Sequence, residues 1–469
     1  MADRHAVNLA RAMTAPVRQA AHNVLTDVDS NRYDLATALD HGRRDLVDSR
    51  DRALLGEIGF GVYRWRAALD HVISQLSSRA LTNIDDSVIR ILRVALYQLI
   101  KLDRIPTHAV VADAVALTRE TGVSSASGFV NAVLRTYTER RRPISFPLIP
   151  SCENDETFDH TAAVNYLSIT LSHPSWLIER WLDRHGWTST AAWVRFNNRR
   201  APVTIRPLLN GVSQSELTTR LRRTGVHTVA TRVAQRGLIV TDGSISTAGE
   251  RLNSEYIIQE EGAQVVTELV CSLTATLENP LILDLCAAPG VKTVGLACNG
   301  NPVRVVATDY RERRINLLIE NLAQHNISNA SVVQLNAEQP LPFTAAFDVI
   351  VVDAPCSGLG ILRRDPDIRW RRTAEDLEAF SARQLRMLKF ASEALRPRGW
   401  LVYSTCSTEP EETNAVIQQF LSEQRDFRIT RPPTPEFNSC IEPDGFLRTL
   451  PFRDGIDGFF AATLQKRIP

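Results

Sequence analysis

The stretch LDLCAAPGVKT, residues 283 to 293, runs from an apolar segment into a turn built of small residues, a proline and Gly290. An apolar run that ends in such a turn predicts a buried strand, followed by a loop whose backbone can approach a ligand closely. Three similar apolar runs come later in the chain, with helical stretches between them: RVVATD (304–309), FDVIVVDAP (347–355) and GWLVYSTC (399–406). Strands that alternate with helices predict a mostly parallel sheet covered by helices on both faces.

Each of these runs ends in a polar or reactive residue. Ligands of open α/β sheets bind at the carboxyl ends of the strands, so we expect Asp309, Asp353, Cys356 and Cys406 to converge on one cleft. Asp309 follows Gly290 by about twenty residues, where an acidic side chain can accept hydrogen bonds from ribose hydroxyls. The turn lacks the full GxGxxG pattern that cradles a pyrophosphate. The sequence therefore favours an adenosine cofactor without phosphates, such as S-adenosylmethionine, over a nicotinamide cofactor.

The whole chain is too long for one ordinary domain. It has 469 residues, of which 44% are hydrophobic and 23% charged, a composition typical of globular proteins with substantial cores. Helical spacing is clear in SVIRILRVALYQLI (87–100) and HAVVADAVALTRETG (108–122). We therefore predict four regions along the chain: a helical domain (1–142), a proline-rich linker (143–159), an intermediate α+β subdomain (160–270) and a catalytic domain (271–469).

Several classes of protein are disfavoured by the cysteines and by the apolar pattern. The seven cysteines are scattered, odd in number and never in a CxxC spacing, which argues against both a disulfide framework and a metal site. No apolar stretch reaches the length of about 18 residues expected of a membrane span. The opening residues MADRHAVNLARAM (1–13) lack the pattern of a secretory signal. We expect a cytoplasmic monomer without metal.

Three segments taken together resemble the RNA cytosine-C5 methyltransferases of the Nop2/NSUN/Sun group: LDLCAAPGVKT, FDVIVVDAPCSGLGILRRDPDIRW (347–370) and LVYSTCSTEPEE (401–412). The motif DGFF (457–460) is a further shared feature. Within that group, a helical domain like the antitermination factor NusB marks the bacterial enzymes that modify small-subunit (16S) ribosomal RNA, and residues 85–122 and 128–137 resemble that domain. The resemblance implies an all-α NusB-like domain followed by a Rossmann-like class I methyltransferase domain, with a mostly parallel seven-stranded sheet.

The resemblance also implies roles for particular residues. Cytosine C5 is a poor nucleophile, so a thiolate must first add to C6 and activate the ring. The family places this nucleophile in a Thr-Cys motif, here Cys406, and links a second cysteine, here Cys356, to product release. Asp353 matches the acid near the N3 and N4 edge of the cytosine, and Lys292 is its natural partner. The alternative is that a cysteine is a small buried hydrophobe and the aspartate caps a turn, but two cysteines in two matching motifs favour the chemistry.

The residues that match the cofactor site of the family lie at the ends of the predicted strands. They are Cys286, Ala287, Ala288, Pro289, Gly290, Val291, Lys292, Asp309, Asn336 and Asp353. Val291 stands where the family usually has a second glycine, and would be strained if its φ were positive. Asn336 stands where relatives commonly carry an aspartate towards the adenine. We interpret Arg314 and Asn321 as structural, and the glutamates of EPEE (409–412) as the start of a helix.

A cytosine inside a helix cannot expose both faces of its ring, so the substrate must be single-stranded or flipped. The arginine-dense run 362–372 follows the second motif, and its candidate RNA contacts are Arg363, Arg364, Arg369 and Trp370, with Arg371 and Arg372 beside them. Solvated surface arginines are the alternative. The sequence thus predicts a 16S rRNA (cytosine-C5) methyltransferase. Two further hypotheses stay open: an RNA-binding assembly or antitermination factor with a decayed methyltransferase domain, and a tRNA (cytosine-C5) methyltransferase.

Overall fold

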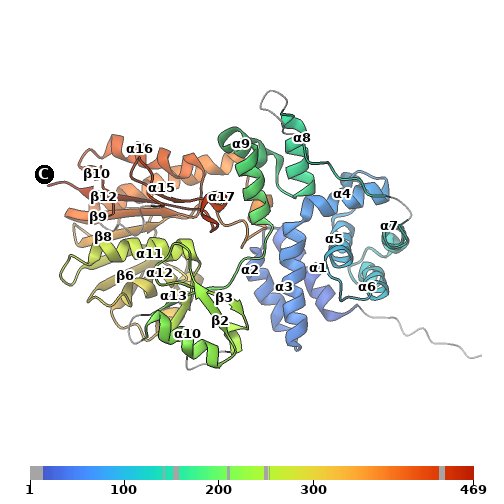
Figure 1. Cartoon of the computed structure of the whole chain (residues 1–469), viewed down its shortest axis with the longest axis horizontal. Coiled ribbons are helices and arrows are strands. Elements are labelled where there is room, and N and C mark those ends of the chain that lie inside the picture. Colours follow the sequence, from blue (N-terminus) through green and yellow to red (C-terminus); the bar gives the residue numbers. More distant parts are fainter. Residues whose placement is uncertain are drawn as a thin grey trace, which may run out of the picture. The chain divides into compact units, whose positions relative to one another are not determined.

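The computed structural model describes residues 14–140, 143–150, 158–208, 212–247, 252, 254–432 and 439–468 (Figure 1). The chain divides into two compact units. The first holds the residues up to Arg199 together with Leu362–Arg371, and the second holds Arg200–Ile361 and Arg372–Pro469. Residues 1–13, on which the prediction about a secretory signal rests, and residues 151–157 of the predicted linker lie outside the described part.

The first unit begins with a group of helices that enclose one apolar core. Their bounds are α1 (Pro16–Asp29), α2 (Leu35–Arg44), α3 (Ser49–Arg64), α4 (Arg66–Ser77), α5 (Asp86–Lys101), α6 (Thr107–Glu120) and α7 (Ser127–Thr138). Helix α5 buries almost its whole apolar side in this core, including Ile91, Leu92 and Leu96. Asp85 caps its first turn by accepting hydrogen bonds from the backbone amides of Ser87 and Val88. The helical prediction for both stretches is confirmed.

The same unit continues through α8 (His160–Asn165), the short π-helical turn η4 (Tyr166–Thr170) and α9 (Ser175–Asn197). The Ser172 hydroxyl after η4 accepts a hydrogen bond from the backbone of Ala67, 2.9 Å away at the start of α4. The predicted boundary at residue 160 therefore does not separate two units, because residues 160–199 are bonded to the helical core. Part of the predicted linker is held as well, since the Ser145 amide donates to Gln75 at 3.0 Å.

The second unit starts with a small antiparallel sheet whose strand order is β2-β3-β1-β4. The strands are β1 (Thr204–Pro207), β2 (His227–Ala230), β3 (Leu238–Asp242) and β4 (Tyr256–Ile258), and α10 (Gln214–Arg223) packs on them. Helix α11 (Glu261–Thr274) follows and packs on the large sheet instead, through Val265, Val266 and Leu269. It spans the predicted boundary at 270/271, and that boundary stays a prediction.

The large sheet has the strand order β10-β12-β9-β8-β5-β6-β7, and β11 pairs with β12 off this path. Its strands are β5 (Leu281–Leu285), β6 (Arg304–Asp309), β7 (Ala330–Gln334), β8 (Phe347–Asp353), β9 (Leu395–Thr405), β10 (Phe427–Ile429), β11 (Leu447–Thr449) and β12 (Phe459–Lys466). The strands from β9 to β7 pair in parallel, and β12 runs antiparallel to β9. The predicted fold class, a mostly parallel sheet after a helical domain, is confirmed, but the described residues form eight strands of this sheet where seven were predicted, because β11 adds to β12.

Helices cover both faces of this sheet (Figure 1). Because successive side chains of a strand point to opposite faces, β5 places Leu283 and Leu285 against α15 (Ala374–Ala394) and α16 (Asn414–Glu423). Ile282 points the other way, towards α11 and α12 (Val291–Ala297). Helix α13 (Glu312–Gln324) packs beside α12 on that second face. This layering leaves the carboxyl ends of the parallel strands as the place where side chains can meet a ligand.

Candidate active site

The two candidate thiols lie together just beyond the ends of two neighbouring strands. Cys406 follows β9 and Cys356 follows β8 by three residues, and their Sγ atoms are 3.2 Å apart. Both side chains are only partly buried. The contact with Cys356, followed by burial, holds the pKa of the Cys406 thiol well above its ordinary value. Cys406 is therefore a protonated thiol in the free protein, and it must lose its proton before it can act as a nucleophile.

A lysine and an aspartate face each other beside the thiols. The Lys292 ammonium, in the first turn of α12, donates to Asp353 Oδ2 at 2.7 Å, and the Ser404 hydroxyl donates to Oδ1 of the same carboxylate at 2.9 Å. Burial is the largest single effect and lowers the pKa of Lys292, but the charge and hydrogen bond of Asp353, together with the charges of Glu260 and Asp284, leave that pKa raised. Asp353 is opposite Ser404 in the pairing of β8 with β9, so the sheet register fixes this contact.

The loop between β5 and α12 turns on Gly290. Its φ is 100°, and a Cβ at this position would lie 2.6 Å from Leu318, so only glycine fits. Val291 is the first residue of α12 and has no positive φ, which removes the strain considered in the sequence analysis. Cys286 at the other end of the loop has a φ of 60°. Burial raises the pKa of its thiol to about 12, and the nearby Asp309 charge adds to the effect.

Asp309 ends β6 with its side chain almost fully buried. Its Oδ1 accepts hydrogen bonds from the backbone amides of Tyr310 and Arg311 at 2.8 and 3.3 Å, and Arg314 Nε lies 3.2 Å from Oδ2. Arg314 also donates to the Ala288 carbonyl, and Asn321 Nδ2 donates to the Pro289 carbonyl at 2.6 Å. These two side chains of α13 hold the loop in place, as their structural interpretation requires.

Asn336 follows β7 and uses its side chain partly for its own turn. Its Oδ1 accepts a hydrogen bond from the backbone amide of Glu338 at 3.0 Å. Its Nδ2 has no hydrogen bond within the described part of the chain, so this amide remains available as a donor. The predicted contact of Asn336 with the adenine stays a prediction.

Comparisons with known proteins agree with this geometry. The sequence model described as "16S rRNA methyltransferase RsmB/F" matches residues 271–465, and the NusB family model matches residues 15–139. The ribosomal RNA small subunit methyltransferase B of Pasteurella multocida is 32% identical over 436 residues, which cover 90% of this chain and 89% of that protein. The chain belongs to the RsmB/F methyltransferase family. The predicted resemblance, including the NusB-like domain, is confirmed, and S-adenosylmethionine is the methyl donor of this family.

Other RsmB/F relatives match over nearly the full length. The corresponding enzyme of Vibrio cholerae is 30% identical over 96% of this chain and 98% of its own length. A ferredoxin-like domain described for this family matches residues 173–245. Among solved structures, PH0851 superposes with a TM-score of 0.77, covering 97% of this chain and 100% of that one at 22% identity. NSun6 from Pyrococcus horikoshii superposes with a TM-score of 0.55 over 63% of this chain and 99% of its own, at 20% identity. At these identities the superpositions show a shared fold.

Arginines of the run 362–372 in this RsmB/F chain make contacts within the protein, whereas the sequence predicted contacts with RNA. Arg369 has no exposed surface, and its guanidinium donates to the carbonyls of Ser172, Asn197 and Leu362 at 2.9, 3.4 and 3.2 Å. Burial lowers its pKa to about 9. The predicted RNA contact of Arg369 is therefore wrong for this structure, because a phosphate cannot reach it.

Trp370 belongs to the first unit as well. Its Nε1 donates to the Tyr63 carbonyl at 2.7 Å, and its ring packs on the core of the helical domain. Arg363 is also mostly buried, with its guanidinium 4.1 Å from the centre of the Phe196 ring. Arg372 instead supports the loop of Cys356, since its Nε donates to the Ser357 carbonyl at 3.0 Å. The contacts of Arg363, Arg364 and Trp370 with RNA remain predictions.

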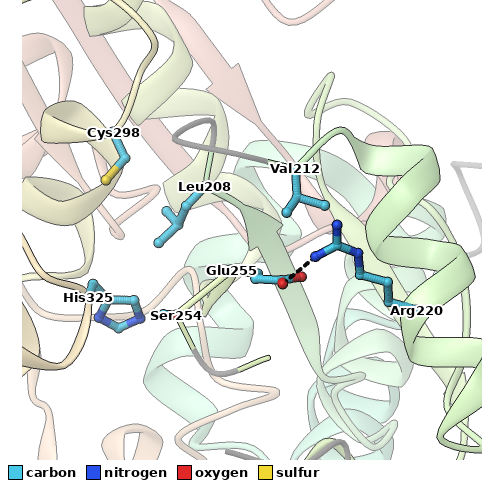
Figure 2. Close-up of a pocket in the computed structure, with 7 residues that line it drawn as sticks. All are labelled: Leu208, Val212, Arg220, Ser254, Glu255, Cys298 and His325. Atoms are coloured by element: carbon cyan, nitrogen blue, oxygen red, sulfur yellow. Dashed lines mark hydrogen bonds and ion pairs between the residues drawn. The ribbon is translucent and has the colours of Figure 1, made fainter. Parts of the chain in front are cut away.

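A cavity of about 290 Å³ in the second unit lies elsewhere (Figure 2). It is lined by Cys298 at the end of α12, His325 at the end of α13, and the ion pair of Arg220 with Glu255. Helices α12 and α13 begin at the cofactor loop side, so their ends lie away from it. None of the predicted site residues lines this cavity.

The described residues contain no group of three or more His, Cys, Asp or Glu side chains able to hold a metal ion. Their six cysteines are all free thiols, and Cys152 lies outside the described part. Within the same residues, no helix combines the length and the apolar character needed to cross a bilayer.

Asp284 is a buried residue of the site that the sequence analysis missed. It lies inside β5, and its Oδ2 accepts a hydrogen bond from Thr293 of α12 at 2.6 Å. Its Oδ1 is buried without a hydrogen-bond partner in the described residues. Burial raises its pKa to about 7, while the Thr293 hydrogen bond opposes the rise. Asp284 thus keeps its proton at mildly acidic pH, where an ordinary aspartate has lost it.

This raised pKa predicts a pH dependence of stability. A carboxyl that keeps its proton only in the folded state makes folding less favourable as pH rises from the unfolded pKa, about 3.9, towards 7. We expect Asp284→Asn, which cannot ionise, to gain stability over the wild type between pH 5 and pH 8, by at most about 3 kcal/mol. Urea unfolding of both proteins across this range measures the slope. A difference that does not change with pH contradicts the prediction, since packing effects give a constant offset.

Proposed function

We propose that the protein transfers a methyl group to C5 of a cytidine in 16S ribosomal RNA, through a temporary bond between Cys406 Sγ and C6 of the ring. The observation that carries this proposal is the 3.2 Å contact of Cys406 with Cys356, beside the Lys292–Asp353 ion pair. A single buried cysteine would need no second thiol at this distance and no charged pair. Two thiols beside an acid suit a reaction that must both form and break a sulfur–carbon bond.

The first step forms the bond from Cys406 Sγ to C6 and opens the C5–C6 double bond, which makes C5 a nucleophile. Because Cys406 begins as a thiol, its proton must move to a base. The charges of Glu260 and Asp353 both act on this thiol, and the oxygens of Asp353 are oriented by Lys292 and Ser404. We assign to Asp353 the uptake of this proton and its return at N3, where negative charge develops on the ring.

The last step removes the C5 proton and breaks the bond from Sγ to C6, which restores the double bond. The contact of Cys356 with the sulfur of Cys406 supports a role for Cys356 in this release. A thiolate at Cys356 takes the C5 proton and becomes a thiol, while Asp353 takes back the N3 proton and returns it to Cys406 as that sulfur leaves, so the ring ends neutral and the only proton lost from the substrate is the one from C5. The Gly360 amide donates to the Cys406 carbonyl at 2.9 Å, which keeps the two loops close during both steps.

The residues present fit S-adenosylmethionine. When bound, this cofactor supplies a methyl group on a positively charged sulfur, which C5 attacks. The Asp309 carboxylate at the end of β6 has acceptor capacity for ribose hydroxyls beyond its two backbone amides. Gly290 gives the loop 286–291 the tight turn that brings its backbone close to a ligand. Asn336 offers its free amide on the adenine side.

The experiment that tests this function is a transfer assay. The full chain is incubated with S-adenosylmethionine labelled in the methyl group and with unmodified 16S rRNA, tRNA or no RNA, and the nucleosides are then separated. We expect label in 5-methylcytidine from 16S rRNA alone. Label from tRNA alone would move the substrate to tRNA, and no label in any RNA would favour an RNA-binding factor without activity.

A further inference from the structure

A buried carboxylate joins the two loops that carry the thiols. Glu412 lies in the short helix η7 (Pro410–Glu412) and has no exposed surface. Its Oε1 accepts hydrogen bonds from the Ser357 amide at 2.8 Å and from Gln384 Nε2 at 3.0 Å. Its Oε2 accepts from the Ser407 hydroxyl at 2.5 Å and from the Ser357 hydroxyl. The glutamates of EPEE do lie at the start of a short helix, as interpreted, and Glu412 in addition accepts these hydrogen bonds.

The positions of these donors in the sequence connect Glu412 to the two candidate thiols. Ser357 directly follows Cys356, and Ser407 directly follows Cys406. One carboxylate thus receives hydrogen bonds from both residues that come after the two candidate thiols. A shift of either loop would lengthen a hydrogen bond to a fully buried charge, which is expensive in a low-dielectric interior.

Glu412 is itself held from a third direction. The Tyr403 hydroxyl lies 2.7 Å from the Glu412 backbone carbonyl and 2.9 Å from Gln384 Oε1, and Tyr403 is fully buried in β9. Gln384 Nε2 also donates to the Pro355 carbonyl, 3.0 Å away, just before Cys356. The carboxylate is thereby anchored to the sheet through Tyr403 and to α15 through Gln384.

We propose that Glu412 is a positioning residue which, through Ser357 and Ser407, sets the distance between the Cys356 and Cys406 sulfur atoms. It touches neither substrate nor cofactor in this role. Its relevance to catalysis rests on the proposed function, but its effect on the geometry of the thiols does not. The backbone bond from Gly360 to Cys406 is a second link between the loops, so loss of Glu412 loosens the pair without separating it.

The proposal can be tested on the free protein with an oxidant. Diamide accepts two hydrogen atoms from two thiols, so one disulfide forms and diamide becomes a hydrazine. The rate at which a Cys356–Cys406 disulfide forms, followed by peptide mass spectrometry, reports how often the two sulfur atoms meet. We expect Glu412→Ala to slow this closure about tenfold or more, because a misplacement of about 1 Å has effects of this size.

Glu412→Gln is the conservative variant. Its amide oxygen can accept from the Ser357 amide and Gln384, and its amide nitrogen can donate to the two serine hydroxyls, which rotate to accept. We therefore expect closure within about threefold of the wild type. The matched control is Glu268→Ala, because Glu268 is a nearly buried carboxylate that accepts from the amides of Gln235 and Arg236 at 3.0 and 3.2 Å, in another part of the same unit. It should lower thermal stability while leaving closure unchanged.

Turnover gives the second readout. With 16S rRNA as substrate, Glu412→Ala should lower kcat about thirtyfold and change the KM for S-adenosylmethionine less than about threefold, since Glu412 does not contact the cofactor loop. Formation of the disulfide needs no RNA. If Glu412→Ala forms it slowly but the wild type methylates no RNA, that result would count against the proposed function and leave the positioning role intact. If Glu412→Ala does not fold, Ser357→Ala/Ser407→Ala takes its place. Wild-type closure and kcat in a folded alanine variant would overturn the proposal.

Discussion

A Cys356→Ala variant incubated with 16S rRNA and S-adenosylmethionine is expected to accumulate a covalent protein–RNA adduct that survives denaturing electrophoresis. Without the second thiol, the methylated ring loses its C5 proton too slowly, and the bond from Cys406 to C6 persists. A Cys406→Ala variant forms no adduct, because the sulfur that adds to C6 is gone. Its methylation should fall by a factor on the order of 10³ or more. The adduct is measured as radiolabelled RNA that migrates with the protein.

The control for both variants is Cys271→Ala. Cys271 is a partly buried free thiol of α11, and no step of the proposed reaction involves it. It should behave as the wild type in both assays. An adduct formed by Cys406→Ala and not by Cys356→Ala would reverse the two roles. Equal activity of all three variants would remove the covalent step from the proposal.

Asp353→Asn is the second change with a large expected effect. The variant keeps the shape of the side chain but cannot accept the proton of Cys406 or return it at N3, and Lys292 loses the carboxylate that lies 2.7 Å away. We expect kcat to fall by a factor of about 10² to 10³, the size seen when one group that stabilises developing charge is removed. Steady-state kinetics at saturating RNA measures it.

Asp309→Asn provides the contrast on the cofactor side. Asp309 ends β6, and its proposed partner is the ribose of S-adenosylmethionine. This variant should raise the KM for S-adenosylmethionine about tenfold and leave kcat nearly unchanged, the pattern of lost binding that is equal in the ground and transition states. A large loss of kcat in Asp309→Asn, or a change of KM alone in Asp353→Asn, would contradict the division of roles.

The sequence predicts the helices and the central strands well because their patterns are local. The apolar spacing of 87–100 falls inside α5, and the run FDVIVVD coincides with β8. The placement of reactive residues at strand ends follows from the parallel sheet, and the structure brings Cys356 to Cys406 and Lys292 to Asp353 as expected. These pairs could be predicted because each of their residues lies within a motif that could be compared with a family.

The residues that sequence reasoning missed depend on contacts between distant segments. Arg369 is held by carbonyls of Ser172 and Asn197, which lie almost two hundred residues earlier, so nothing near it signals burial. Asp284 lies between two leucines of a buried strand, and an ionisable residue at such a position does not fit the apolar pattern. For Glu412 the sequence does contain a signal, because each candidate cysteine is followed directly by a serine. Two serine hydroxyls at matching positions can share one hydrogen-bond acceptor.

The segment Leu362–Arg371 has a consequence for how this chain can be divided. It follows the loop of Cys356 in the sequence, yet it belongs to the helical unit, and the chain returns to the methyltransferase unit at Arg372. No single cut can therefore release the two parts intact. A truncated catalytic fragment would separate Arg369 from its carbonyl partners. The Arg369 guanidinium would then lose these hydrogen bonds and need water in their place. Swapping the front domain of such an enzyme therefore requires replacing this internal decapeptide as well.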